Sequence, residues 1–464
     1  MTGAEKLAEF ATTLTLDDVP SEVAHHAKLH LLDTIGCGLA AHATGVAGEG
    51  RQAMSELGGD AQSTVIATDA RLPAPNAAFA NAMLCHGLDF DDTHSDSVSH
   101  VSTVTCPAAL AVGEAQGLGG AEVLAAIVGA NEVVTRLGMA ASGRFHARGF
   151  HPTAICGIFG ATCAAARLTG VDAATAAGAL GIAGSMASGL FAYLEDGTAT
   201  KPIHPAWAAH GGILASRLSA LGAEGPPSVV EGKFGLYHAF LGAERGEIDI
   251  DAQLADLGSR WETPRIAYKP FPVCHFMHGS LGAAAEASGR TLSPDGIVSV
   301  VVTVPEAGVS LVLEPAAQKI APRSDYEGKF SLQYSVASML VRGHVAVSDF
   351  SEDAIADPAV LAVAAKVTYE TPEYPTYPQA FPGGVRVTLA DGTVLERDFP
   401  YQKGGPENPM SDDEVRAKFR ANALLAVPAE LADRLEASIL DLESQDDVTA
   451  ALAPLRAVAE TVAA

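Results

Sequence analysis

Apolar residues recur at helical spacing along about the first 260 residues, and short polar or glycine-rich joints separate the apolar runs. Pro20–Glu22 predicts a helix start, because proline is favoured in the first turn, and Leu29, Leu32 and Ile35 then share one face. Further helices are predicted at Ala77–Leu88, Pro107–Gln116, Ala121–Leu137, Pro152–Leu168, Ala173–Tyr193 and Pro205–Leu221. This part of the chain therefore indicates an all-α domain.

The pattern changes near Trp261, where short β-branched segments begin to alternate with helical ones. Asp391-Gly392 is typical of a tight turn between two alternating segments, so a hairpin is predicted there. The predicted strands are Ile297–Val304, Lys366–Tyr369, Val385–Leu389 and Val394–Phe399, and the predicted helices among them are Ser331–Arg342 and Asp357–Val363. Together these segments predict an α+β unit.

The last part of the chain returns to a helical pattern after Gly404–Pro406, at Ser411–Ala426 and Pro428–Leu442. A chain of 464 residues is longer than the ~250–300 residues at which a single core stops growing. We therefore predict a mainly α fold with an α+β second domain. Both chain ends, residues 1–265 and 404–464, form a large all-helical domain, and residues 266–403 form a smaller inserted α+β lid domain.

The charge balance narrows the classes of partner. The chain has 55 acidic and 29 basic residues and a formal net charge of −26, which repels nucleic acid and anionic membrane surfaces. We therefore expect neither as a partner. A site for a small anion would have to be cationic locally, so lysines and histidines beside apolar or glycine-rich segments are informative.

Cysteine usage and apolar segments indicate the compartment. The cysteines form no CxxC pair and most lie in apolar surroundings, which is typical of reduced, buried thiols. The N-terminus lacks the basic-then-apolar layout of a signal peptide. The uncharged stretch Ala173–Leu194 is rich in alanine and glycine, so a core helix explains it better than a membrane span. We expect a cytoplasmic protein.

An acidic segment follows the predicted helix Ala77–Leu88. It contains Asp89, Asp91, Asp92, Thr93, His94 and Asp96, and His100 follows it. Because closely spaced carboxylates repel one another, a solvated loop is the simplest interpretation. The segment also resembles the Mg²⁺-binding acidic motif of helical terpenoid synthases, but the chain has few aromatic residues and no obvious second ligand set. Its place at a helix end, between apolar helices, also suits an enclosed active site.

Two Lys-Pro loops and one further histidine are the other candidates. Lys201-Pro202 precedes His204, and Lys269-Pro270 precedes His275 and His278. His151 precedes Pro152 at a predicted helix start, where the helix dipole favours a neutral imidazole. Mobile surface lysines and a capping histidine are the alternatives. A zinc site at Cys274, His275 and His278 lacks further ligands at suitable spacing, so we predict no metal. The segments together predict a cationic pocket with acid/base groups.

These segments, in this order, resemble the MmgE/PrpD family, which includes 2-methylcitrate dehydratases, cis-aconitate decarboxylases and iminodisuccinate epimerase. The matching pieces are Leu88–Thr93, Gly149–Thr153, Lys201–Gly211, Lys269–His278, Phe330–Tyr334 and Asn408–Ser411. The resemblance implies a helical domain built from both chain ends, an inserted α+β lid domain, a homodimer and no metal or organic cofactor.

The resemblance also implies a set of site residues. Those expected to be catalytic are His151, His100, Asp89, Lys201 and Lys269. Those expected to bind substrate are Thr93 and His278, and the histidines of the two Lys-Pro loops, His275 and His204, are added to them. The chain reads His100-Val101-Ser102 where relatives commonly have His-Pro-Ser. The tyrosine that decarboxylases use ahead of Phe330–Tyr334 has no evident match, which counts against a cis-aconitate decarboxylase, and the Glu-Trp-Gly-His loop typical of 2-methylcitrate dehydratases is missing.

From this resemblance we expect a cofactor-free lyase that acts on a small anionic polycarboxylate by proton abstraction next to a carboxylate. Dehydration of a 2-methylcitrate-like hydroxy acid is the first hypothesis. The alternatives are an epimerase of an iminodisuccinate-like amino-dicarboxylate and a cis-aconitate-type decarboxylase. A helical dimeric binding module is the non-enzymatic alternative.

Overall fold

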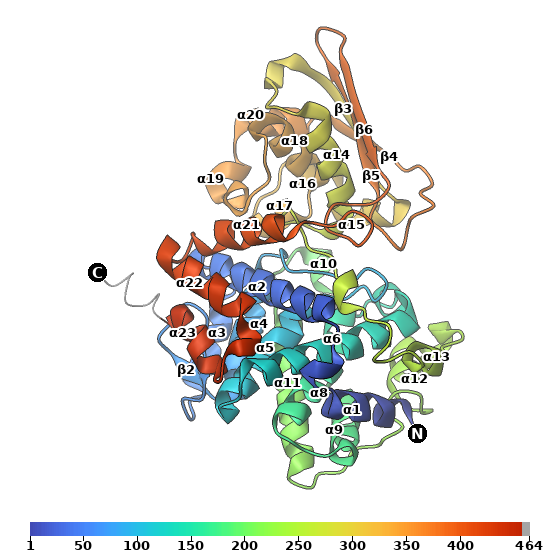
Figure 1. Cartoon of the computed structure of the whole chain (residues 1–464). Helices are drawn as coiled ribbons and strands as arrows, with labels where there is room; N and C mark the ends of the chain where they lie inside the picture. Colours follow the sequence, from blue (N-terminus) through green and yellow to red (C-terminus); the bar gives the residue numbers. More distant parts are fainter. Residues whose placement is uncertain (457–464) are drawn as a thin grey trace.

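The computed structural model describes residues 1–456, which are mainly α-helical with a small mixed sheet (Figure 1). Figure 1 shows a larger helical unit at the bottom and a smaller unit with the sheet at the top. One apolar core joins residues between Ala4 and Ile266 with residues between Phe419 and Leu455. A second core is built from residues between Val273 and Val387, together with Tyr193.

The larger unit is a bundle of closely packed helices. The N-terminal helices are α1 (Gly3–Thr13), α2 (Ser21–Ala43), α3 (Gly48–Glu56), α4 (Ala74–Gly87), α5 (Ser102–Gln116), α6 (Gly120–Ala141), α7 (Arg144–Ala147), α8 (Pro152–Leu168), α9 (Ala173–Met186), α10 (Tyr193–Asp196), α11 (Ile203–Ala220), α12 (Leu236–Leu241) and α13 (Ile250–Leu254). Helix α8 packs against α11 and α6. The approach is so close that a Cβ atom at Gly212 would lie 2.6 Å from Ala161 and 2.8 Å from the carbonyl oxygen of Ile158. Small residues therefore set the spacing of this core.

The C-terminal helices α21 (Asp412–Ala423), α22 (Ala429–Leu440) and α23 (Val448–Arg456) return to the larger unit. Helix α21 packs against α2, and the Lys418 Nζ lies 2.8 Å from Asp33 Oδ1. The same ammonium donates to the carbonyl oxygen of Phe90 at 2.8 Å. The C-terminal segment therefore holds the backbone of the acidic segment that the sequence singles out.

The smaller unit contains a four-stranded sheet in the order β4–β3–β5–β6. Strand β3 (Ile297–Thr303) is parallel to β4 (Val367–Glu370) and antiparallel to β5 (Gly383–Leu389), and β5 pairs with β6 (Val394–Phe399) in a hairpin. Its helices are α14 (His278–Ser288), α15 (Val309–Val312), α16 (Ala316–Ile320), α17 (Asp325–Lys329), α18 (Leu332–Arg342), α19 (Glu352–Ile355) and α20 (Pro358–Ala364). Helix α14 packs against β5 and β6, and α18 lies beside α14.

The predicted hairpin and most predicted elements are present, with small differences at their ends. The predicted helix Ala173–Tyr193 is wrong beyond Met186, where α9 ends. The chain turns there, because Gly189 has φ +124° and Leu190 forms an antiparallel bridge with Phe150. The sequence did not predict this break, because the stretch Ala173–Leu194 is uncharged throughout.

By length and composition, helix α6 could cross a membrane. In the protein, 94% of its most apolar window is buried against other elements.

Candidate active site

A cavity of about 90 Å³ lies where the two units meet, and both contribute to its walls. The larger unit supplies polar groups, among them Asp89, Thr93, His94, His100, His146, His151 and Lys201. The segment between the two cores adds Lys269. The apolar side chains are Val98, Phe191, Leu194, Phe276, Leu311, Phe330 and Phe381. We call the wall with Asp89, His100, Lys201 and Lys269 the charged side, and the wall that the smaller unit builds with Phe276, Leu311, Phe330 and Phe381 the apolar side.

Asp89 is at the centre of the charged side. It follows the end of α4 with a left-handed backbone, φ +52°, a conformation that costs a non-glycine residue about 1–3 kcal/mol. Lys201 donates to Asp89 Oδ1 at 2.6 Å, and Lys269 donates to the same atom at 3.1 Å and to the Asp89 carbonyl oxygen at 2.8 Å. The two lysines therefore fix both the side chain and the strained backbone of Asp89.

This arrangement determines the charge of Asp89 and Lys201. Burial alone would raise the pKa of Asp89, but Lys201 and then Lys269 outweigh it and hold the pKa well below its usual value. Burial would lower the pKa of Lys201, and Asp89 outweighs it in turn, so that pKa is raised. In the wall of the cavity two lysine side chains therefore accompany one carboxylate, an arrangement that suits an anionic substrate.

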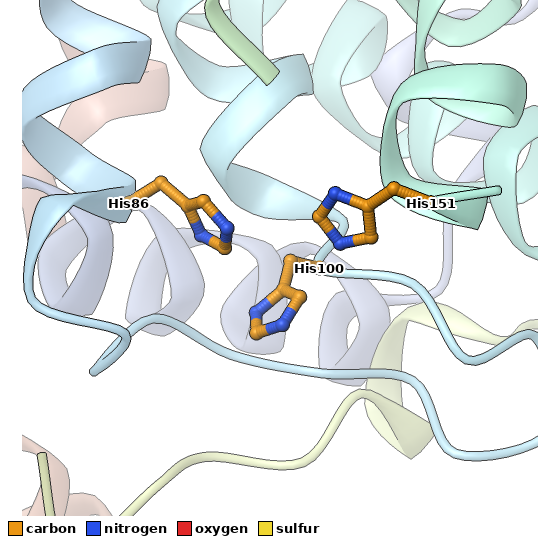
Figure 2. A group of neighbouring side chains, drawn as sticks. All are labelled: His86, His100 and His151. Carbon is orange, nitrogen blue, oxygen red and sulfur yellow. The ribbon is translucent and has the colours of Figure 1, made fainter. Parts of the chain in front are cut away.

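Three histidines lie next to one another beside this charged group, and Figure 2 shows their rings. His86 is on α4, His100 precedes α5, and His151 is the residue before the first turn of α8. The ring centroids of His86 and His100 are 4.6 Å apart, and that of His151 lies 5.8 Å from His86 and 5.9 Å from His100. Burial lowers the pKa of His100 to about 4 and that of His151 well below its usual value. Both imidazoles are neutral at pH 7 in the free protein.

The other carboxylates of the acidic segment differ in their surroundings. Asp91 Oδ2 lies 2.8 Å from His86 Nδ1 and 3.1 Å from His100 Nδ1. Asp92 pairs with His30 at 2.8 Å and accepts from the backbone N–H of Ser102 at 3.2 Å. Only Asp96 faces the surface, 3.7 Å from Arg265. The solvated-loop interpretation therefore holds for Asp96 and fails for Asp89, Asp91 and Asp92, which are at most 2% exposed.

The remaining predicted residues divide into two groups. Thr93 and His275 line the cavity, and Thr93 Oγ1 lies 2.5 Å from His275 Nδ1. His204 and His278 do not line it. His204 Nδ1 lies 3.0 Å from His151 Nδ1, and the ring of His278 lies 4.9 Å from that of His275. In this structure His204 and His278 contact the cavity histidines His151 and His275, and their binding of substrate stays a prediction.

Two overlapping groups have the composition of a metal site: His86, His100 and His151, and His86, Asp89, Asp91 and His100. In each, the donor atoms lie within 4.8 Å of one another. However, the Lys201 ammonium lies 3.4 Å from His100 Nε2 and 2.6 Å from Asp89 Oδ1. A metal ion bound to these atoms would be repelled by this ammonium at close range, so the position of Lys201 disfavours a metal here. Cys274, His275 and His278 do not form such a group within residues 1–456.

Several residues that line the cavity or lie behind its wall had no sequence signal strong enough to single them out. His86 lies one turn before Asp89, inside an apolar helix, where a histidine is usually only packed. His94 belongs to the acidic segment, but its Nε2 lies 3.3 Å from Glu262, far along the sequence. Tyr193, which lines the cavity, is the last residue of the predicted helix Ala173–Tyr193, and that helix ends at Met186 in the structure.

The chain matches the MmgE/PrpD N-terminal domain over residues 5–249 and the MmgE/PrpD C-terminal domain over residues 271–444. The chain belongs to the MmgE/PrpD family. Similar curated proteins include a cis-aconitate decarboxylase-like protein of Aspergillus oryzae, 28% identical over 97% of this chain and 96% of its own length. The human cis-aconitate decarboxylase is 30% identical over 94% of this chain and 92% of its own length. The Aspergillus terreus enzyme is 27% identical over 96% of this chain and 94% of its own length.

Two departures from the MmgE/PrpD pattern can now be located. His100 lines the cavity despite the His-Val-Ser sequence, and its backbone N–H donates to Thr153 Oγ1 at 2.9 Å. Tyr326 and Lys319 line a neighbouring cavity of about 330 Å³, and neither lines the first. The tyrosine that does line the first cavity is Tyr193.

Proposed function

We propose that this chain is a lyase of small polycarboxylates and that decarboxylation of a cis-aconitate-like substrate is its reaction. The single observation that carries the proposal is the division of the cavity into a side with Lys201 and Lys269 and a side of phenyl and aliphatic groups. The names of the similar proteins support the same reaction. Their full-length similarity outweighs the absence of a matching tyrosine, so decarboxylation replaces dehydration as the first hypothesis.

Two lysines are suited to the negative charge that builds up in this reaction. Each ammonium has three N–H donors, and Asp89 takes one from Lys201 and two from Lys269. A retained substrate carboxylate would accept a remaining donor from each. When the C–C bond to the departing carboxylate breaks, its electron pair stays on the substrate and spreads toward the retained carboxylate. Fixed donors at such a position typically contribute about 10²–10³ in kcat.

The apolar side suits the departing group. Phe330, Phe276 and Leu311 offer no hydrogen bond to a carboxylate, whereas uncharged CO₂ needs none. The carbanion then takes one proton, so the substrate loses CO₂ and gains one hydrogen. We assign this proton to His100 or His151, with Thr93 and His275 orienting the substrate. Substrate carboxylates would raise the pKa of either imidazole and charge it for this step.

Dehydration of a 2-methylcitrate-like hydroxy acid is the second candidate. It is favoured by the lack of a tyrosine at residues 316–320 and by the Thr93–His275 pair, which could hold a leaving hydroxyl. An epimerase needs two proton donors on opposite faces of one carbon. The rings of His100 and His151 are 5.9 Å apart between centroids, too close to hold a substrate between them, so this pair does not support epimerisation.

The test is turnover of cis-aconitate, citrate, 2-methylcitrate and iminodisuccinate in D₂O, followed by proton NMR and CO₂ release. Decarboxylation predicts stoichiometric CO₂ with one deuterium in the product. A new conjugated acid without CO₂ means dehydration, and deuterium uptake without either loss means epimerisation. If no substrate turns over, the binding module becomes the better hypothesis. We also propose that the chain works as a homodimer, which light scattering tests.

A further inference from the structure

Asp91 is a fully buried carboxylate that does not line the cavity. One of its oxygens, Oδ2, faces two imidazoles, at 2.8 Å from His86 Nδ1 and 3.1 Å from His100 Nδ1. The His86 contact has hydrogen-bond geometry, whereas within residues 1–456 neither His100 Nδ1 nor the other carboxylate oxygen, Oδ1, has an aligned hydrogen-bond partner. Burial alone would raise the pKa of Asp91, but His86 and then His100 outweigh it and hold the pKa well below its usual value. Asp91 is therefore ionised, and hydrogen on both Nδ1 atoms is favoured, because a bare lone pair there would face the carboxylate at 2.8 and 3.1 Å. At the other nitrogen of His100, Nε2, the Lys201 ammonium can only donate, which favours the same tautomer.

This contact fixes which nitrogen of His100 is available to a substrate. With hydrogen on Nδ1, the neutral ring has its lone pair on Nε2. His100 Nε2 lies on the other side of the ring from Asp91, at 3.4 Å from Lys201 Nζ and 3.8 Å from Asp89 Oδ1. That is the charged side of the cavity.

We propose that Asp91 is a positioning residue, which holds His100 in the Nδ1–H tautomer so that Nε2 exchanges the proton with substrate, while His86 anchors Asp91 from behind. The expected change in kcat rests on the proposed function, whereas the tautomer of His100 does not. A carboxylate behind an imidazole orients the ring and stabilises its charged form. The loss of Asp91 would therefore impair proton transfer without removing a substrate contact.

The neighbouring residue provides a matched control. Asp92 is also fully buried and also faces a histidine, His30, at 2.8 Å. The His30 ring stacks on Tyr268 with centroids 4.3 Å apart, and neither residue lines the cavity. Asp91→Asn and Asp92→Asn remove the same charge from adjacent buried positions, so a general effect on folding should appear in both.

The first experiment compares these variants in the full chain with the substrate that the wild type turns over. Asp91→Asn is expected to lower kcat about 10²-fold or more, with KM changed less than threefold, since general acid–base catalysis typically contributes ~10²–10⁴. Asp92→Asn is expected to keep kcat within about threefold. Equal losses of kcat in the two variants would overturn the proposal.

The pH dependence of kcat is the second readout, because a merely structural role of Asp91 would leave it unchanged. The groups facing His100 are Asp89, Asp91, Lys201, His86 and His151. Because Asp91 raises the pKa of His100, its removal should shift the alkaline limb of kcat to lower pH by about one unit. Asp92→Asn should leave the limb in place. An unmoved limb in Asp91→Asn would contradict the assignment.

The tautomer can be measured without any turnover. Ring-¹⁵N NMR of the histidine-labelled wild type, with the His100 signals assigned by their loss in His100→Gln, should show hydrogen on Nδ1 and a bare Nε2. Hydrogen on Nε2 would refute the inference, whatever the variants do. If no polycarboxylate is turned over, the proposed function fails, and the NMR result still decides this point by itself.

Discussion

The two sides of the cavity are built on opposite principles. On the side of the larger unit, Asp89, Lys201 and His100 are buried and held by hydrogen bonds or ion contacts to one another. On the side of the smaller unit, Phe276, Leu311 and Phe330 present apolar surface, with His275 as the polar exception. The difference indicates two roles. The charged side holds charged groups and protons in place before substrate binds, and the apolar side excludes water and determines the shape of the cavity.

Lys269 joins the two sides. It lies between the two apolar cores, and its ammonium holds the backbone and the side chain of Asp89. Ala267, two residues before Lys269, pairs with Thr93 through two backbone hydrogen bonds of 2.7 and 2.9 Å. The segment that leads into the smaller unit therefore also completes the charged side. Ala267 and Lys269 thus fix the position of the charged side relative to the smaller unit.

The largest effect is expected from the charged side. Lys201→Ala should lower kcat/KM about 10³-fold, because a fixed donor to the developing charge is lost and Asp89 keeps only one ammonium partner. Steady-state kinetics with the substrate found in the screen measures it. Lys233→Ala, which removes an exposed lysine, is the control and should change nothing. An unchanged kcat/KM in Lys201→Ala would refute the role of this side.

A smaller effect is expected from the apolar side. Phe330→Ala should lower kcat about tenfold by admitting water, and should also lower the free energy of unfolding by about 3–5 kcal/mol, since Phe330 is buried. Phe234→Ala, at a side chain that is 88% exposed, should do neither. Denaturant unfolding and kinetics on the same samples separate the two quantities. Full activity in a folded Phe330→Ala would mean that the apolar side has no part in the reaction.

Acid should lower the free energy of unfolding of the protein, because buried histidines lie on and behind the charged side. Burial lowers the pKa of His100 and of His204 to about 4, so the unfolded chain binds more protons than the native one below pH 6.5. The contribution to stability is present above pH 6.5 and is lost as pH falls toward 4, on the order of 3 kcal/mol for His100. Guanidinium unfolding at pH 7 and pH 5 measures the loss. His204→Gln should reduce the dependence, and a pH-independent stability would contradict the buried neutral imidazoles.

No effect is expected from a chelator. Because Lys201 lies among the potential metal ligands, dialysis against EDTA should leave kcat within error of the untreated protein. Recovery of activity on adding Zn²⁺ after such treatment would reverse the interpretation of the charged side.

The sequence was sufficient to predict site residues that belong to a recognisable local motif. Lys-Pro loops, the acidic segment and His151 before Pro152 were recognisable in the chain, and the mainly helical fold followed from apolar spacing. It was insufficient where burial decides the role. Nothing local distinguishes Asp91 and Asp92, which meet His100 and His30, from Asp96, which faces Arg265 at the surface.

Site residues that come together from distant segments also could not be predicted from local sequence patterns. His86 acquires its role only because α4 ends beside the residues before α5 and α8. The apolar side draws on Phe276, Leu311, Phe330 and Phe381, which are spread over more than 100 residues and meet only through the fold of the smaller unit. Tyr193 was hidden because the end of α9 depends on a bridge between Leu190 and Phe150.

The most direct test of the central claim is CO₂ release from cis-aconitate by the wild type and by Lys201→Ala, in parallel, in D₂O. We predict that the wild type releases one CO₂ per substrate consumed, with one deuterium in the product, and that Lys201→Ala does so about 10³-fold more slowly. Consumption of substrate without CO₂, or equal rates in the two proteins, would contradict a decarboxylating lyase whose charged side contains Lys201.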